Sequence, residues 1–181
     1  YLEIMKSLGY ANYYQVLDAK DYGIPQNRQR LFTVSIRNGI DKQYEFPLKQ
    51  NLQLNLKDLL EDMPKDKYYL KESTVHSYTN ITKQQKEKGN GFRFEVSDGN
   101  VIAKTITTKA GGRMTDNFIR TDKGVRKLTP KECWRLMGFS DDSFEKASEV
   151  NSDTQLFKQA GNSIVVNILI GILNNLLKEE H

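Results

Sequence analysis

The chain has 181 residues, which is enough for one domain or two small ones, and its 38% hydrophobic and 10% aromatic residues exclude a wholly disordered chain. The net charge of +4 and the sequence pI of about 9.0 permit a polyanionic partner. One cysteine excludes an internal disulfide framework, and the two histidines, His76 and His181, have no metal-ligand partners at a suitable spacing. No apolar run could span a bilayer or act as a signal peptide, so we expect a cytoplasmic protein without a metal.

The first third of the sequence predicts two helices and two strands. Residues 2–8 place apolar side chains on one helical face, and Gly9 is a typical C-terminal stop. A chain that opens inside an amphipathic helix indicates a larger protein or a trimmed independent domain. Residues 13–17 and 31–36 read as strands that form an antiparallel pair across a long loop. Residues 55–63 predict a short helix.

Residues 65–125 differ in composition from the rest of the chain. They are polar and rich in Lys, Thr, Asn and Gly, with short apolar pieces between them. Residues 92–96 alternate like a half-exposed strand, residues 101–108 are β-branched, and another strand is expected at Phe118. This pattern predicts a small, loop-rich β subdomain.

A capping box marks the return to helices. Thr129 is expected to cap the start of a helix, and Glu132 in the first turn is expected to complete the capping box by accepting from the Thr129 backbone N–H. Gly138 is expected to end this helix. Cys133 lies on the apolar face of that helix and has no histidine at a useful spacing. We interpret it as a buried thiol and not as a nucleophile.

Two further helices are expected over residues 153–159 and 164–177. Gly161 separates them, and Asn162 or Ser163 is the expected cap of the second. The same polar residues, placed before an apolar helix, could also bind an anionic ligand together with the N–H groups of the helix. The sequence is therefore compatible with either a plain helix cap or a ligand site.

Basic residues occur at two other places. Arg28 and Arg30 follow Gln26 in a loop, and because they are two residues apart at the entry to a strand, their side chains should point the same way. The pair could form a fork that binds a carboxylate, a phosphate or a base carbonyl, or it could be a solvated basic edge. In the middle region Lys104, Lys109, Arg113 and Arg120 stand among Thr and Gly, which fits either phosphate contacts or a soluble loop surface.

Three blocks together carry a family resemblance. Residues 19–30 match the A-x-x-x-G-x-P-Q-x-R-x-R block of the DNA cytosine-5 methyltransferases. Residues 126–139 resemble their R-x-L-T-x-x-E-x-x-R-L-x-G-F block, and residues 159–165 resemble their final Q-x-G-N-S/A-V block. The blocks stand in the family's order, with the variable target-recognition region between the first two. The resemblance covers nearly the whole chain.

The resemblance implies an α/β fold: the C-terminal part of a Rossmann-like, S-adenosylmethionine-dependent methyltransferase domain plus a small β-rich target-recognition domain. It implies a catalytic portion over residues 1–64, a recognition domain with its scaffold helix over 65–140, and a return to the catalytic domain over 141–181. We expect the first strands and the last helix to pack together in one α/β domain.

Three family motifs that precede these blocks do not occur in this sequence: the glycine-rich cofactor loop, the Pro-Cys nucleophile and the Glu-Asn-Val motif. The resemblance therefore implies either a truncated chain or one subunit of a split enzyme. Its implied partners are double-stranded DNA and the missing N-terminal half, which would belong to the same polypeptide or to a separate subunit. On its own this chain is expected to be inactive.

The resemblance also implies a mechanism. Family members flip the target cytosine out of the duplex, add a cysteine thiolate to C6 and transfer a methyl group from S-adenosylmethionine to C5. Arg30 would stabilise the base at O2, supported by Arg28 and Gln26, while Asn162 and Ser163 would line the cofactor site. The DNA contacts would come from Thr105 near the flipped base and from Lys104, Lys109, Gly111, Gly112 and Arg113 beside it.

Three alternatives compete with a bacterial or phage restriction-modification enzyme. A sequence-specific DNA-binding module without chemistry would need neither Arg30 nor the pair Asn162 and Ser163. The RNA-methylating branch of the family carries a Cys-Phe-Thr motif in its recognition region, and residues 65–125 contain no cysteine. A purely structural domain leaves the three ordered motifs unexplained.

Overall fold

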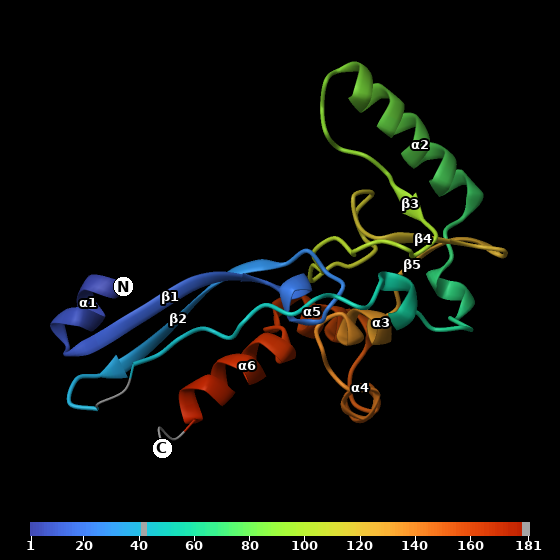
Figure 1. The fold of residues 1–181 in the computed structure, drawn as a ribbon. Coiled ribbons are helices and arrows are strands. Elements are labelled where there is room, and N and C mark those ends of the chain that lie inside the picture. The colour runs from blue at the N-terminus through green and yellow to red at the C-terminus, as the bar shows by residue number, and fades with distance from the viewer. Residues whose placement is uncertain (41–42, 179–181) are drawn as a thin grey trace.

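The computed structural model describes residues 1–40 and 43–178; His181 lies outside the described residues. A long antiparallel hairpin forms one arm of the molecule (Figure 1), with β1 (Tyr10–Asp18) paired along its length to β2 (Gln29–Arg37). The short helix α1 (Leu2–Ser7) precedes it, and Gly9 follows with a φ of 81°. The predicted helix and both strands are confirmed, and the strands are longer than the sequence indicated.

The C-terminal helix α6 (Val166–Leu177) lies along the same arm (Figure 1). The extended segment 43–50 runs between this helix and the hairpin, because Asn175 donates to the Glu45 carbonyl at 3.0 Å and Tyr22 donates to the Pro47 carbonyl at 3.0 Å. Tyr22 ends the 3-10 turn Ala19–Tyr22. The hairpin, the segment 43–50 and α6 thus pack together as predicted.

The opposite end of the molecule is a separate lobe (Figure 1). Its sheet has the order β3 (Val96–Ser97), β4 (Phe118–Thr121) and β5 (Gly124–Lys127), with β3 parallel to β4 and β4 antiparallel to β5. The predicted strand over residues 101–108 is wrong: that stretch is extended but forms only an isolated bridge at Ala103, since it pairs with a loop and not with a strand. The strand predicted over 92–96 is reduced to the two residues of β3.

The same lobe holds helix α2 (Glu72–Glu87), which the loop-rich β prediction missed. None of its 16 residues is buried, and its apolar residues Val75, Tyr78 and Ile81 are too few to make a clear helical stripe in the sequence. The ring of Tyr78 packs against Phe94 and Phe118, at centroid distances of 5.3 and 6.2 Å. Tertiary contact therefore holds a helix that its sequence only weakly predicts.

Three helices join the two ends: α3 (Pro130–Arg135), α4 (Asp141–Ser148) and α5 (Asp153–Asn162). The predicted capping box of α3 is present, and Gly138 turns the chain at a φ of 83°. Helix α4, capped by Ser140, was missed because its short, charged sequence offers little apolar periodicity. The 3-10 turn Leu56–Leu59 replaces the short helix predicted over 55–63, and a further 3-10 turn, Asp66–Tyr68, follows it.

The expected start of the last helix is also corrected. Asn162 is the final residue of α5 and Ser163 follows it as the C-terminal cap, so neither caps α6, which begins at Val166 after an extended Val165. The break arises because Ser163 and Val165 adopt extended backbone angles. In the described part of the chain no single helix is long and apolar enough to cross a membrane; only α5 and α6 together, bent by 41°, pass a test of length and composition.

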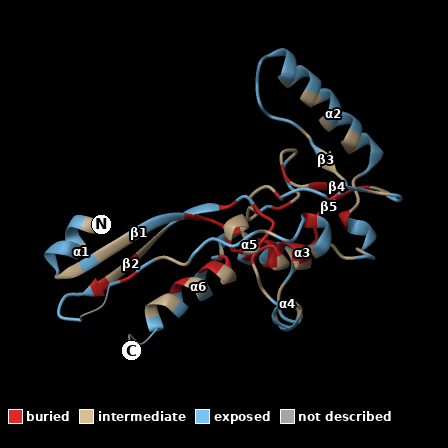
Figure 2. Cartoon of the chain, in the orientation of Figure 1, coloured by how far each residue is buried: buried red, intermediate tan, exposed pale blue. Residues whose placement is uncertain are grey.

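Buried residues gather where the arm meets the lobe (Figure 2). A bidentate ion pair between Arg126 and Glu132 lies there, with N···O distances of 2.7 and 2.9 Å and side chains 1% and 0% exposed. The Glu132 carboxylate also accepts from the backbone N–H groups of Thr129 and Glu61, each at 2.8 Å. This carboxylate ties β5, α3 and the 3-10 segment before the lobe into one unit.

Replacing Glu132 by Gln should lower the free energy of unfolding by about 3 to 5 kcal/mol, because Arg126 then keeps a buried charge without a counter-charge. Asp142→Asn is the matched control, since Asp142 pairs with Lys146 on an exposed surface and its loss should cost less than about 1 kcal/mol. Chemical denaturation of the two variants measures the difference. Equal costs would contradict the structural importance of the buried pair.

Candidate DNA and cofactor site

Two side chains of the first motif hold the backbone of Ile106 from both sides. Gln26 accepts from the Ile106 N–H at 2.8 Å, and Arg28 donates to the Ile106 carbonyl at 2.9 Å. The amide of Gln26 also donates to the Leu136 carbonyl at 2.6 Å, and the residue is fully buried. One glutamine therefore joins the hairpin loop, the separate lobe and the end of α3.

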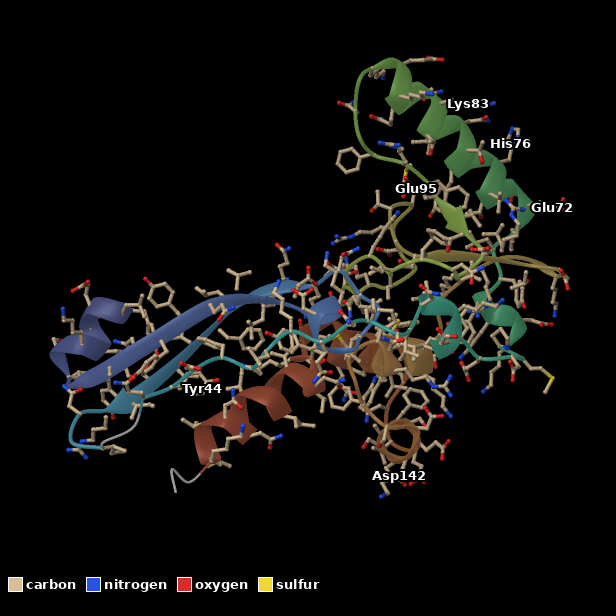
Figure 3. The ribbon with its side chains drawn as sticks, viewed as in Figure 1. Tyr44, Glu72, His76, Lys83, Glu95 and Asp142 are labelled. Atoms are coloured by element: carbon tan, nitrogen blue, oxygen red, sulfur yellow. The ribbon has the colours of Figure 1, made fainter. Side chains whose placement is uncertain are left out.

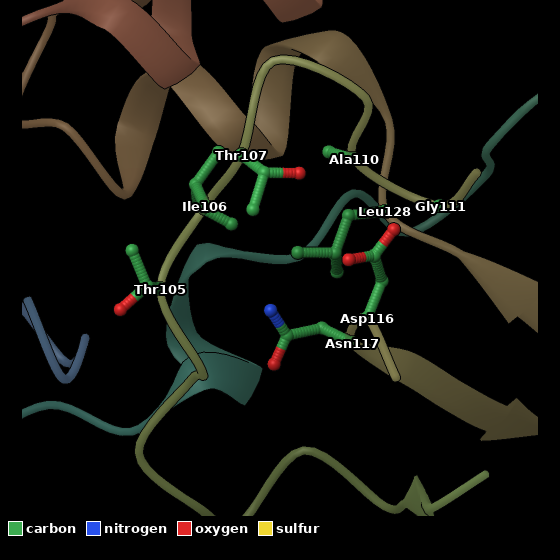
Figure 4. A pocket seen from close by; sticks show the side chains of 8 residues that line it. All are labelled: Thr105, Ile106, Thr107, Ala110, Gly111, Asp116, Asn117 and Leu128. Carbon is green, nitrogen blue, oxygen red and sulfur yellow. The ribbon is translucent and has the colours of Figure 1, made fainter. Parts of the chain in front are cut away.

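The neighbouring backbone strengthens this junction. Ala103 donates to the Pro25 carbonyl and accepts from Asn27, both at 2.8 Å. The Thr105 hydroxyl donates to the Asn27 carbonyl at 2.5 Å. Thr105 and Ile106 point to opposite sides of their segment, and Ile106 lies toward the lobe interior (Figure 4). Thr105 is thereby fixed beside the hairpin loop.

Arg28 reaches a third part of the chain. Its guanidinium donates to the carbonyls of Gly161 and Ser163 at 2.9 and 3.1 Å, between α5 and α6. Burial, and secondly the charge of Arg30, lower the pKa of Arg28 to about 10, so it remains a cation at neutral pH. Within the described residues no carboxylate pairs with it. Arg28 thus connects the first and the last motif block to the segment around Ile106 through backbone carbonyls.

Gly161 permits the closest approach between the lobe and the C-terminal helices. A Cβ at this position would lie 2.3 Å from the Thr108 nitrogen and 2.5 Å from the Thr107 carbonyl carbon. Both are backbone atoms, which cannot turn aside as a flexible side chain can. The glycine of the last motif is therefore required by packing.

Gly161→Ala should lower the free energy of unfolding by about 1 to 3 kcal/mol through overpacking, even though alanine is the better helix former. Gly91→Ala serves as the control, because nothing lies within 4 Å of a Cβ built there. Thermal unfolding compares the two. A Gly161→Ala variant as stable as the Gly91→Ala variant would be inconsistent with this close approach.

Arg30 differs from Arg28 in its exposure and its hydrogen bonds, although only one residue separates them. Arg30 is exposed, and among the described residues its guanidinium donates only to the Gln29 carbonyl, at 2.7 Å. It borders an open hollow of about 360 Å³ between β2 and the start of α6. The hollow is lined by both polar and apolar side chains: Arg28, Arg30, Phe32, Asn162, Ser163 and Ile168. The structure therefore brings Arg30 together with the predicted cofactor residues.

The two predicted cofactor residues differ in how free they are. Ser163 donates its hydroxyl to the Ala160 carbonyl at 2.9 Å. Asn162 is exposed, and its side-chain amide forms no hydrogen bond with the described residues. Asn162 is thus the freer of the two to bind a ligand in the hollow.

The predicted DNA-binding loop is ordered by its own hydrogen bonds. Gly112 donates to the Lys109 carbonyl at 2.7 Å, and Gly111 takes a φ of 76° in that turn. Arg113 donates its backbone N–H to the Asp116 carboxylate at 3.0 Å. Lys109, Gly112 and Arg113 are exposed, so their availability fits the predicted contacts with DNA.

Lys104 is less available than its neighbours. Its ammonium pairs with Glu95 at 2.9 Å, and that pairing holds the pKa of Glu95 below its usual value. Its backbone is fixed by Asn117, which accepts from the Lys104 N–H at 2.8 Å and donates to the Lys104 carbonyl at 3.1 Å. No local pattern in the sequence indicates Glu95 or Asn117 as partners, because each lies nine or more residues from Lys104.

Cys133 is fully buried, and burial followed by the charge of Glu132 raises the pKa of its thiol well above the usual value. The predicted burial of this thiol is confirmed. A group of three or more His, Cys, Asp or Glu side chains that could hold a metal is absent from residues 1–40 and 43–178.

Comparison with known families identifies this arrangement. Residues 1–178 match the family model described as C-5 cytosine-specific DNA methylase. The chain belongs to this family. Its members use S-adenosylmethionine as the methyl donor.

Relatives and solved structures agree with that assignment. The chain is 38% identical to the type II methyltransferase M2.ScrFI of Lactococcus lactis subsp. cremoris, over 99% of this chain and 49% of the relative. It is 36% identical to M.Bsp6I of Bacillus sp. (strain RFL6), over 97% of this chain and 58% of the relative. The chain thus spans about half the length of the curated relatives it matches.

Two solved methyltransferases share the fold. The Entamoeba histolytica methyltransferase EhMeth superposes with a TM-score of 0.74 at 18% identity, over 98% of this chain and 57% of the other. The Dnmt2 methyltransferase of S. pombe gives the same TM-score and identity, over 97% of this chain and 58% of the other. The predicted α/β methyltransferase fold is confirmed.

Proposed function

We propose that this chain is the target-recognising and cofactor-closing part of a DNA (cytosine-5) methyltransferase of a bacterial or phage restriction-modification system. The observation that carries this is the pair Gln26 and Arg28, which hold Ile106 from both sides. Gln26 also bonds to Leu136 of the second motif and Arg28 to Gly161 of the third, so all three family motifs meet beside Arg30. The proposal includes the division into residues 1–64, 65–140 and 141–181. It also places the protein in the cytoplasm.

The proposed roles follow from exposure. Arg30 is free to donate to the O2 carbonyl of a flipped cytosine and to stabilise the charge that develops there. Gln26 and Arg28 are positioning residues, since their polar atoms are already bonded within the chain. Thr105 holds the segment that faces the base, and Lys104, Lys109, Gly111, Gly112 and Arg113 belong to the DNA-contacting surface.

The hollow beside Arg30 fits part of a cofactor site. Its volume of about 360 Å³ lies within the usual range for small-molecule pockets, and it combines the apolar Phe32 and Ile168 with the free amide of Asn162. Asn162 and Ser163 would hold S-adenosylmethionine from this side. When bound, this cofactor supplies the methyl group. The nucleophilic cysteine would come from an N-terminal half, within the same polypeptide or in a separate subunit.

The purified chain should therefore bind duplex DNA but transfer no methyl group from labelled S-adenosylmethionine. A fusion of the N-terminal half of M2.ScrFI to this chain should restore transfer to C5, because it supplies the missing motifs. Label incorporated by the chain alone would contradict the proposal. A soluble fusion that binds DNA without transferring label would favour the alternative, a non-catalytic sequence-specific DNA-binding module.

Within an active fusion, Arg30→Ala should cut turnover by roughly a hundredfold or more and leave DNA affinity nearly unchanged, because its contact forms with developing charge. Lys109→Ala should do the reverse: affinity falls and becomes less salt-dependent, while turnover at saturating DNA holds. Steady-state kinetics and equilibrium binding separate the two effects. If Arg30→Ala lost binding and kept turnover, its proposed role would be refuted.

A further inference from the structure

The positive charge of the chain is concentrated around α2. Residues 71–93 contain five basic and two acidic residues, so they carry +3 of the total net charge of +4. In the other residues the positive and negative charges are almost balanced. A local excess of this kind in a segment apart from the catalytic motifs calls for a polyanionic partner of its own.

Helix α2 is attached to the lobe along one face only. Tyr78 packs against Phe94 and Phe118, and Thr82 accepts a hydrogen bond from the Phe94 N–H at 2.9 Å. The helix projects from the molecule beyond β3 (Figure 1). Its remaining surface is in contact with solvent.

The outer surface carries polar residues at helical spacing. His76, Asn80 and Lys83 follow one another at i, i+4 and i+7, and Lys86 lies on the same flank as Lys83. Figure 3 shows His76 and Lys83 on the side of α2 turned away from Glu95. All four residues are exposed.

The lysines at the C-terminal end of α2, including Lys88, which caps it, also lack carboxylate partners. Seven lysines elsewhere in the described chain pair with carboxylates within 4.0 Å. Lys83, Lys86 and Lys88 form no such pair with any described residue, although Glu87 is their neighbour in sequence. Their charges are therefore available to a ligand.

We propose that α2 is a second DNA-binding element, whose Lys83, Lys86 and Lys88 contact the phosphate backbone outside the sequence that the 104–113 loop reads. The inference rests on the proposed function, because DNA is the polyanion that this family modifies. Flexible lysines supply point charges to phosphates and carry little base information. The contact thus extends the bound length of the duplex without changing sequence preference.

The test is DNA binding by the purified chain, measured by fluorescence anisotropy over a range of salt on two duplexes of unrelated sequence. The triple variant K83Q/K86Q/K88Q keeps residues of good helix propensity. The control K49Q/K67Q/K146Q removes the same three charges from exposed lysines that already pair with carboxylates. Circular dichroism checks that both variants keep the helix content of the parent.

For the α2 variant we expect the slope of log affinity against log salt to fall by about 2 to 3, with affinity at least about tenfold lower at 0.1 M salt on both duplexes. The control should change neither quantity by a comparable amount. Equal losses in both variants, or no loss in the α2 variant, would overturn the assignment while leaving the proposed function intact. A loss confined to one duplex would overturn it too, since α2 would then read bases. A parent chain that binds neither duplex would refute both proposals.

Discussion

The hold on Ile106 is the constraint on which the rest of the molecule depends. A residue whose backbone is buried at the junction of the arm and the lobe must have both its N–H and its carbonyl satisfied, because leaving either without a partner costs about 1 to 3 kcal/mol. Here both partners are side chains from a single loop, Gln26 and Arg28. The lobe can therefore dock on the arm in only one register, and a shift by one residue would leave all of these groups unpaired.

A second buried polar unit fixes the lobe from its other side. Arg126 and Glu132 pair on β5 and α3, and the same carboxylate accepts from Thr129 and Glu61. Ion pairs buried this completely are not a strong source of stability, since desolvation offsets most of their attraction. Their geometry is demanding, however, and we infer that this pair sets where β5 meets α3. The two polar units together hold the exposed loop with Lys109 and Arg113 at a fixed place relative to Arg30.

How far the sequence predicts this structure depends on how far apart the interacting residues lie. The capping box of Thr129 and Glu132 was predicted correctly because both partners stand within one helical turn. The bond between Gln26 and Ile106 spans 80 residues, and no local pattern could predict it. Helix α2 was missed for a related reason, since its stability depends on the packing of Tyr78 against Phe94 and Phe118, which follow much later in the chain. The motif residues were found by resemblance, but their division into buried and exposed roles required the fold.

That division explains how two arginines with the same spacing on a strand come to differ. Arg28 is desolvated and bonded to three carbonyls, so its charge is fixed in place but not cancelled by a carboxylate. Arg30, one residue further into β2, stays at the rim of the hollow with its guanidinium exposed. Charge interactions are stronger where water is partly excluded, so the buried cation raises the positive potential at the hollow more than a solvated one would. An anionic group that enters, or a carbonyl oxygen that gains negative charge there, is stabilised by both arginines, although only Arg30 is free to touch it. The same burial that makes Arg28 a structural support thus lets it assist the exposed arginine at a distance.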